Sequence, residues 1–327
     1  MEIFEIAELI RSVNMYEIAA KTNEGLILTS DEEKVVSQLD THFKEIGKKG
    51  HDSEHEIASF IQKVINEEIY NTPDELLGLL FEQGTIGTFD DFEDITAPKN
   101  TLIAYDAAKG GNVPRSFLDI GKLVPTWKNM QIETDISFAD LERDGWKKVS
   151  TITEFAIATF KNRMFAAIFD VIDAAIASGE NYLEAAGAKP TQADMDAISL
   201  YINDRTESGV IVALSKYVQA ASKLTGFVSD EMKNEVHRTG RLGTYDGVSL
   251  TPISSAKKLG DDTKLLKDKR MYGVAGKLGV INMKGEVKTY QIEDPNKEVF
   301  HIMFKDFTFG FAFNDTALEN VFKMTLK

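Results

Sequence analysis

The sequence predicts an α+β fold built around one long helix. Residues 151–178 carry the longest uninterrupted helical pattern in the chain, and further helical patterns fill residues 1–100. From Tyr272 onward the pattern is that of β-strands. The chain has 327 residues, of which 43% are hydrophobic, so it can form two or three domains around a large core.

The long helix, residues 151–178, has signals at both ends. Thr151 and Glu154 match a T-x-x-E capping box, and Gly179 can take the left-handed conformation that ends a helix. At 1.5 Å per residue the segment would be about 42 Å long. Charged residues interrupt its apolar run, which excludes a membrane span. Apolar residues at three- and four-residue steps define the face expected to be buried: Phe155, Ala158, Phe165, Ile168, Phe169, Ile172 and Ile176.

Residues 1–100 are acidic and mostly helical by pattern. They hold 22 acidic and 8 basic side chains, whereas residues 101–327 hold 30 and 29, so the change in charge predicts a domain boundary near Pro98. The net charge of −15 argues against general binding of nucleic-acid phosphates. The patterns predict helices at residues 2–16, 30–46 and 53–70, a short helix opened by Pro73, and a loop from Gly84 through the acidic cluster 90–94.

The pattern of residues 101–138 predicts a long two-armed loop. Residues 101–107 and 130–138 are strand-like, and the Ala- and Gly-rich segment 107–112 between them would be a flexible tip. The loop has too little apolar surface for a core of its own, and isolated hairpins are marginal in water. We therefore expect it to lie against another copy of the chain.

The remaining residues predict a compact lobe followed by closing strands. Thr191 and Asp194 match a helix N-terminus, and Asp246-Gly247 marks a tight turn. Alternating helices and strands of this kind are typical of an α/β or α+β lobe. Helices are expected at residues 216–224 and from Ser229. Strands are expected at 210–214, at 248–252, on either side of Lys284-Gly285 and at 299–313, and the tail 318–326 would add a last strand or helix.

The chain offers little that could carry out catalysis. It has no cysteine, which excludes disulfides and thiol chemistry. His51, Glu54 and His55 match the H-x-x-E-H zinc pattern, but Ser53 reads as a helix N-cap and would leave His51 outside the helix. We therefore expect no metal, no cofactor and no enzymatic activity.

The order of these elements resembles that of tailed-phage major capsid proteins, whose Johnson fold is shared with encapsulin shells. NVPRSFLD at 112–119 and LVPTWKNMQIETDISFADLERDGW at 123–146 resemble the extended loop and its return strand. GRLGTYDGVSLTPI at 240–253 resembles the end of the axial lobe, and EVFHIMFKDFTFGFAF at 298–313 resembles the closing strands. The resemblance implies a phage major capsid fold with these parts: an N-terminal helical arm (1–97), an extended β-loop (98–134), a peripheral domain (135–190 and 296–327) with the spine helix 151–178, and an α/β axial domain (191–295).

The resemblance also implies a function. The chain would be a major capsid protein that self-assembles, as pentamers and hexamers, into an icosahedral phage head enclosing double-stranded DNA. Portal, scaffold and decoration proteins are further candidate partners; DNA would be bound only non-specifically, and no membrane is involved. Its location would be the virion, after assembly in the host cytoplasm. The inter-subunit contacts expected from the extended loop are Lys109, Gly110, Gly111, Asn112, Arg115, Phe117, Lys122 and Trp127.

Other functions remain open at this point. An encapsulin-like nanocompartment shell would use the same fold. A zinc hydrolase would use the H-x-x-E-H at 51–55, and an acidic adaptor would bind a basic partner through residues 1–100, which could then be deleted without unfolding the rest.

Overall fold

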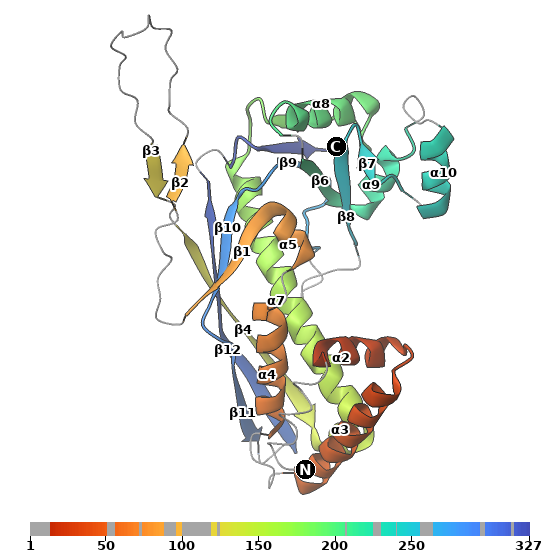
Figure 1. The fold of residues 1–327 in the computed structure, drawn as a ribbon, viewed down its shortest axis with the longest axis vertical. Coiled ribbons are helices and arrows are strands. Elements are labelled where there is room, and N and C mark those ends of the chain that lie inside the picture. Colours follow the sequence, from red (N-terminus) through yellow and green to blue (C-terminus); the bar gives the residue numbers. More distant parts are fainter. Residues whose placement is uncertain are drawn as a thin grey trace, which may run out of the picture.

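The structure, a computed structural model, describes residues 14–50, 56–71, 74–87, 96–99, 119–122, 125–206, 208–224, 230–239, 241–255, 264–294, 298–314 and 317–327. One long helix, α7 (Trp146–Ala175), runs through the centre of the molecule, with a β-sheet beside it and a second β-sheet towards its C-terminal end (Figure 1). Its 30 residues correspond to a length of about 45 Å. The predicted mixture of helices and strands around a long helix is confirmed.

A five-stranded sheet is organised by β12 (Val299–Phe313). Along one edge, β12 pairs with β4 (Thr126–Ser137). Along the other edge it pairs with β11 (Lys288–Asp294) and then with β10 (Gly279–Lys284), and β1 (Phe81–Ile86) extends the sheet in parallel beside β10. Alternate β12 residues that include five phenylalanines are buried on one face, where they form core with α7.

A helical layer precedes and covers the start of α7. Its helices are α2 (Met15–Glu24), α3 (Ser30–Lys49), α4 (Glu56–Asn71) and, just before β1, α5 (Glu75–Leu80). Phe43 of α3 and Phe60 of α4 pack around Trp146, with ring centroids 5.3 to 6.3 Å apart. Burying three large aromatic side chains together gives this layer a core shared with the spine.

The helix α6 (Phe138–Asp144) links β4 to α7 and lies against α3. A Cβ added at Gly47 would lie 2.6 Å from the backbone nitrogen of Glu142, so the absence of a side chain allows the two helices to approach. Gly47 was expected to follow the end of its helix. Instead α3 continues to Lys49 with Gly50 as its C-cap, and Gly47 is the small residue at the contact with α6.

A six-stranded sheet forms the second lobe. Its strand order is β5 (Tyr182–Glu184), β13 (Val321–Thr325), β9 (Arg270–Ala275), β6 (Gly209–Leu214), β8 (Val248–Ile253) and β7 (Thr244–Tyr245). α8 (Gln192–Asn203) packs on β8, β9 and β13, and α9 (Ser215–Ala221) packs on β6 and β8. α10 (Asp230–Thr239) lies at the outer end of this lobe (Figure 1).

Several local predictions are confirmed. Thr191 caps α8 through a capping box with Asp194, the strand at 210–214 is fully buried in β6, and Asp246 and Gly247 have positive φ in the turn that enters β8. The long strand at 299–313 is β12. The tail forms β13.

The long helix differs from its prediction at both ends. It begins at Trp146 after Gly145, not at Thr151, and it ends at Ala175, before Gly179. Phe155, placed on the buried face by its spacing, is 64% exposed. The helical repeat gives the angle of each side chain, but it does not say which part of the helix is covered by other elements.

Two segments of the N-terminal third also differ from prediction. Residues 15–24 form α2, capped by Asn14 at its start and Gly25 at its end. The predicted helix was 2–16, of which residues 2–13 lie outside the described residues. Gly84, expected in a loop, lies in β1 opposite Asn282 of β10. Residues 51–55 and 72–73 lie outside the described residues.

The pairing of the strands does not follow the domain bounds expected from the resemblance. β10 and β11 fall within 191–295 but pair in the sheet of β12, whereas β13 falls within 296–327 but pairs with β9. β4 begins within 98–134 and is a strand of the body.

Candidate subunit-assembly surface

The base of the extended loop is a short two-stranded ribbon that projects from the body. β2 (Thr96–Lys99) pairs antiparallel with β3 (Asp119–Lys122), with Thr96 opposite Lys122. Figure 1 shows this ribbon extending beyond the end of the five-stranded sheet. Within the described residues, β2 and β3 pair with each other and with no strand of the body. The β2–β3 ribbon itself therefore lies outside the core of the body.

The loop residues expected to make contacts are only partly described. Lys109, Gly110, Gly111, Asn112, Arg115 and Phe117 lie outside the described residues. Lys122 ends β3, and Trp127 lies near the start of β4, opposite Gly310 of β12. The structure therefore places two of the eight expected residues near the root of the loop and leaves the role of all eight a prediction.

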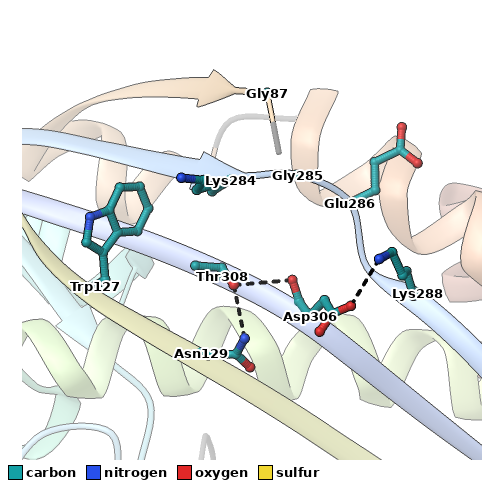
Figure 2. Close-up of a pocket in the computed structure, with 9 residues that line it drawn as sticks. All are labelled: Gly87, Trp127, Asn129, Lys284, Gly285, Glu286, Lys288, Asp306 and Thr308. Carbon is teal, nitrogen blue, oxygen red and sulfur yellow. Dashed lines mark hydrogen bonds and ion pairs between the residues drawn. The ribbon is translucent and has the colours of Figure 1, made fainter. Parts of the chain in front are cut away.

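An open depression of about 690 Å³ lies at this root (Figure 2). Asn129 donates a hydrogen bond to the Thr308 hydroxyl at 3.2 Å, and Lys288 forms an ion pair with Asp306 at 3.4 Å. Its lining comes from the start of β4, from β12, and from the β10–β11 turn: Gly87, Trp127, Asn129, Lys284, Gly285, Glu286, Lys288, Asp306 and Thr308. The side chains of this lining are aromatic, amide, hydroxyl and charged groups, which can contact a partner.

Trp127 is the large aromatic side chain of this depression. It is 36% exposed, and the Lys284 ammonium lies 5.2 Å from the centroid of its ring. A cation over an aromatic face contributes about 0.5–1 kcal/mol at an exposed site. The indole is therefore held in place while much of its surface remains accessible to a partner.

Polar contacts with α2 and α3 fix the N-terminal end of the spine helix. Asn23 of α2 accepts hydrogen bonds from Ser150 (3.1 Å) and Thr151 (3.0 Å) and donates to Glu154 at 2.5 Å. Trp146 N–H donates to Asp40 at 3.2 Å. Thr151 and Glu154, expected to cap the helix, therefore bind α2 instead.

The other end of the spine is fixed by a polar cluster around Asp173. Lys323 of β13 lies 2.7 Å from the Asp173 carboxylate, Lys267 lies 3.0 Å away, and Tyr272 donates to it at 3.1 Å. Burial alone raises the pKa of Asp173, but hydrogen bonds from Lys323 and Lys267 outweigh it and lower the pKa to about 2. The charged carboxylate thus ties α7 to the six-stranded sheet.

No local sequence pattern indicates this cluster as a unit. The charged residues lie about 100 and 150 positions apart, and only a basic residue within the apolar strand 321–325 could have suggested a buried ion pair. The zinc candidates His51, Glu54 and His55 lie outside the described residues. No group of three metal-ligating side chains occurs among the residues that are described.

A family model of phage capsid proteins matches most of the chain. The family model described as "SPbeta prophage-derived putative capsid protein YonB" matches residues 5–316. The search of curated proteins gave no match. Of the described helices, none is both long and apolar enough to cross a membrane.

Solved phage structures share the fold at low sequence identity. A chain of the "Gordonia phage Cozz" structure has a TM-score of 0.52 and 11% identity, over 78% of this chain and 87% of that chain. A chain of "Satellite phage P4 procapsid including size determination (Sid) protein" has a TM-score of 0.51 and 9% identity, over 82% and 90%. A chain of "Mycobacterium phage Ogopogo" has a TM-score of 0.51 and 9% identity, over 78% and 92%. At these identities the likeness establishes the fold.

Proposed function

The chain belongs to the family of the prophage-derived capsid protein YonB, and from this premise we propose that it is a major capsid protein that self-assembles into an icosahedral phage head enclosing double-stranded DNA. The family is one of capsid structural proteins and not of enzymes. Shells form when many identical copies make repeated contacts whose rotations close.

The main support for the proposal is the two-stranded ribbon of β2 and β3, which projects from the body at the base of the loop. β2 and β3 pair only with each other among the described strands and project from the body (Figure 1). A projecting loop contributes nothing to its own core, but it adds buried area when it lies on a neighbour. Trp127 at its root provides an exposed aromatic side chain of the kind enriched at interfaces.

Within the proposed shell, the segments would have distinct roles. The N-terminal arm (1–97) supplies the helical layer and β1, and the extended loop (98–134) reaches a neighbour. The peripheral domain holds the spine helix and the five-stranded sheet, so β10 and β11 join it. The axial domain holds the six-stranded sheet, so β13 joins that domain, and its copies meet as pentamers and hexamers.

Charge is consistent with this arrangement. Residues 1–100 carry nearly all of the excess negative charge, whereas residues 101–327 are close to neutral. A near-neutral body allows like copies to approach, and an acidic layer facing the interior would repel packaged DNA. DNA would then be enclosed without specific binding. The protein would be located in the virion after assembly in the host cytoplasm, where portal, scaffold and decoration proteins are its further candidate partners.

Negative-stain electron microscopy of the purified protein tests the proposal. We expect closed particles or capsomers, and a strict monomer by light scattering at high concentration would contradict the proposal. A variant in which residues 100–118 are replaced by a short Gly-Ser turn is expected to keep the thermal unfolding midpoint and to lose the particles. Particles of normal size from this variant would show that the loop is not what joins the copies.

A further inference from the structure

The central strand of the five-stranded sheet carries an extra residue near its middle. Six apolar residues of β12 are buried on one face of the sheet: Phe300, Ile302, Phe304, Phe307, Phe309 and Phe311. Their spacing changes from even to odd numbers after Phe304. The pairing with β4 shifts at the same place, because Phe304 lies opposite Ile132 and Phe307 lies opposite Met130. Two residues of β12 thus lie opposite one residue of β4, which defines a β-bulge.

The backbone of Asp306, the second residue of the bulge, is strained. Its φ is 64°, in the left-handed region that residues other than glycine rarely occupy. Aspartate tolerates this region better than most residues, whereas a β-branched side chain does not. A bulge increases the local twist and bends the strand that carries it. The chain therefore has a built-in bend in the middle of β12.

Among the described strands beside β12, only β4 crosses the bulge. Along the other edge, β11 pairs with β12 up to Lys305 and β10 pairs with it from Thr308, so neither strand spans Asp306. The bulge divides the sheet into two parts. The β11 half consists of β11 with residues 299–304 and 132–137, and the β10 half consists of β1 and β10 with residues 307–313 and 126–130. A change of angle between the halves would therefore bend only β12 and β4.

The contacts on the open face of the bend can rearrange. Lys288 of the β11 half forms an ion pair with Asp306 at 3.4 Å, and the two side chains are 55% and 48% exposed. Exposed pairs of this kind contribute little to stability. The open depression of about 690 Å³ lies over the same point and is lined from both halves, as Figure 2 shows for Asn129 and Lys288. It leaves space for the two halves to tilt towards each other.

On the buried face, a pair of aromatic rings fixes the bend to the spine helix. Phe307 directly follows the bulge and is fully buried, and its ring centroid lies 4.6 Å from that of Phe160 of α7. Phe304, the last buried residue before the bulge, is also fully buried. Because the side chains on both sides of the bulge are anchored in the core, the ends of the sheet are the parts that can move.

The two halves are connected to different parts of the subunit. In chain order β1 precedes β2 and β3 precedes β4, so both strands of the loop base are joined to the β10 half. The β11 half is bound to the helical layer, because the Thr289 N–H donates to Gln62 of α4 at 2.9 Å. A change of angle between the halves therefore changes the direction of the loop base relative to the helical layer.

We propose that this bulge is a bend point at which the five-stranded sheet takes different angles in copies that occupy different positions of the shell. The inference rests on the proposed function, because a closed shell of pentamers and hexamers places identical chains in unequal surroundings. Hinges consist of a few residues that absorb the change in backbone angles. Lys305 and Asp306 supply such residues in the middle of the sheet.

Cryo-electron microscopy of wild-type particles tests the bend directly, by comparing copies from pentamers and hexamers. We expect each half of the sheet to superpose to within about 1 Å, with a different angle between the halves and the change confined to residues 304–307. A sheet that superposes as one rigid body at both positions would overturn the proposal. Absence of wild-type particles would count against the proposed function, whereas particles with a rigid sheet would count against the bend alone.

Backbone geometry at Asp306 gives a second test. Asp306→Val introduces a β-branched residue that resists a positive φ, and we expect it to lower the yield of closed particles at least tenfold. Asp306→Gly is the matched control, because it removes the same carboxylate but accepts a positive φ, and it should assemble normally. Normal assembly by Asp306→Val would overturn the proposal. An equal loss in both variants would also overturn it, because the carboxylate and not the backbone conformation would then be required.

Deletion of Asp306 separates the bend from the fold. Without this residue Phe304, Lys305 and Phe307 alternate regularly, so the pairing of β12 with β4 continues in register. We expect a subunit that keeps a single cooperative thermal transition but assembles into open sheets or tubes in place of closed particles. Closed particles of wild-type size from this variant would contradict a role for the bend.

Discussion

The ammonium of Lys323 lies 2.7 Å from the carboxylate of Asp173, at a position where the lysine side chain is only 6% exposed. The same ammonium donates to the backbone carbonyls of Asp173 and Ile176, each at 2.8 Å. These carbonyls belong to the C-terminal turn of α7, where a positive charge also interacts favourably with the helix dipole. One lysine of β13 thus joins the six-stranded sheet to the end of the spine helix.

Asp173→Asn is expected to destabilise the subunit by about 3 kcal/mol, because it leaves a buried lysine without its countercharge. Asp306→Asn is the control. It removes the partner of Lys288 from an ion pair in which both side chains are about half exposed, and such pairs contribute less than about 1 kcal/mol. Urea unfolding measures both. Equal losses would show that the buried Lys323–Asp173 pair stabilises the subunit no more than the exposed Lys288–Asp306 pair does.

The same carboxylate predicts how stability depends on pH. Burial raises the pKa of Asp173, but Lys323 and Lys267 lower it from 3.8 to about 2. A depressed folded-state pKa adds stability that is complete above the unfolded value and is lost as the pH falls through the folded value. The free-energy gap between wild type and Asp173→Asn should therefore shrink by about 2 kcal/mol between about pH 5 and pH 2. A gap that stays constant over this range would contradict the assignment.

Two phenylalanines, one in the helical layer and one on the spine helix, test which surfaces are buried. Phe43, 1% exposed, contacts both Phe60 and Trp146, whereas Phe155 is 64% exposed. We expect Phe43→Ala to cost about 3–5 kcal/mol and Phe155→Ala to change stability by less than about 0.5 kcal/mol. Chemical denaturation of both variants measures the contrast. Similar losses would show that Phe155 is covered in the subunit.

The helical layer also bears on the acidic-adaptor function. β1 belongs to the five-stranded sheet, and Phe43 and Phe60 share a core with Trp146 of the spine. Deleting residues 1–97 is therefore expected to unfold the body, as judged by loss of the cooperative thermal transition. The adaptor function requires the opposite result, a folded body that has lost only its partner.

Sequence patterns succeeded where a signal was local. The capping box of Thr191 and Asp194, the Asp246-Gly247 turn and the alternation of β12 each involve residues within a few positions of one another. In these three cases the local backbone hydrogen bonds and sterics agree with the tertiary structure. They support an α+β fold with a long helix, whereas the capsid architecture was implied by the resemblance.

Predictions failed where a distant segment decides the conformation. Thr151 and Glu154 have the spacing of a cap, yet their partner is Asn23, about 130 residues earlier. Gly84 looks like a loop residue, but β1 forms because β10, nearly 200 residues later, supplies its hydrogen bonds. A groove between β4 and α7 combines residues of a strand and a helix, and no pattern within either element indicates it.

Gly47→Ala gives a prediction whose sign depends on tertiary structure. Helix propensity alone predicts a gain of about 1 kcal/mol, since alanine is the better helix former. The new Cβ would lie 2.6 Å from the backbone nitrogen of Glu142, so α3 and α6 would have to separate. We expect a net loss of about 1–3 kcal/mol by urea unfolding. A gain in stability would mean that the two helices are not in close contact at this point.

Trp127→Ala tests the loop root as a contact surface. In the subunit, the indole contacts Lys284 and is 36% exposed, so its removal should cost about 2 kcal/mol of folding stability, from its partial burial and the cation over its ring. In a shell, an aromatic side chain buried by a neighbour would be an energetic centre of the interface, worth at least about 2 kcal/mol per contact.

Because each copy repeats the Trp127 contact, the loss multiplies across the shell, and the particle yield of Trp127→Ala should fall far more than its stability. Tyr290→Ala is the matched control: Tyr290 is 46% exposed on the same sheet, and Lys305 lies 5.6 Å from its ring centroid. It belongs to β11, distant from the loop root (Figure 1). Sedimentation of assembled particles, with the unfolding midpoint measured in parallel, compares the two variants. If Tyr290→Ala loses particles and Trp127→Ala does not, the contact lies at the other end of the sheet.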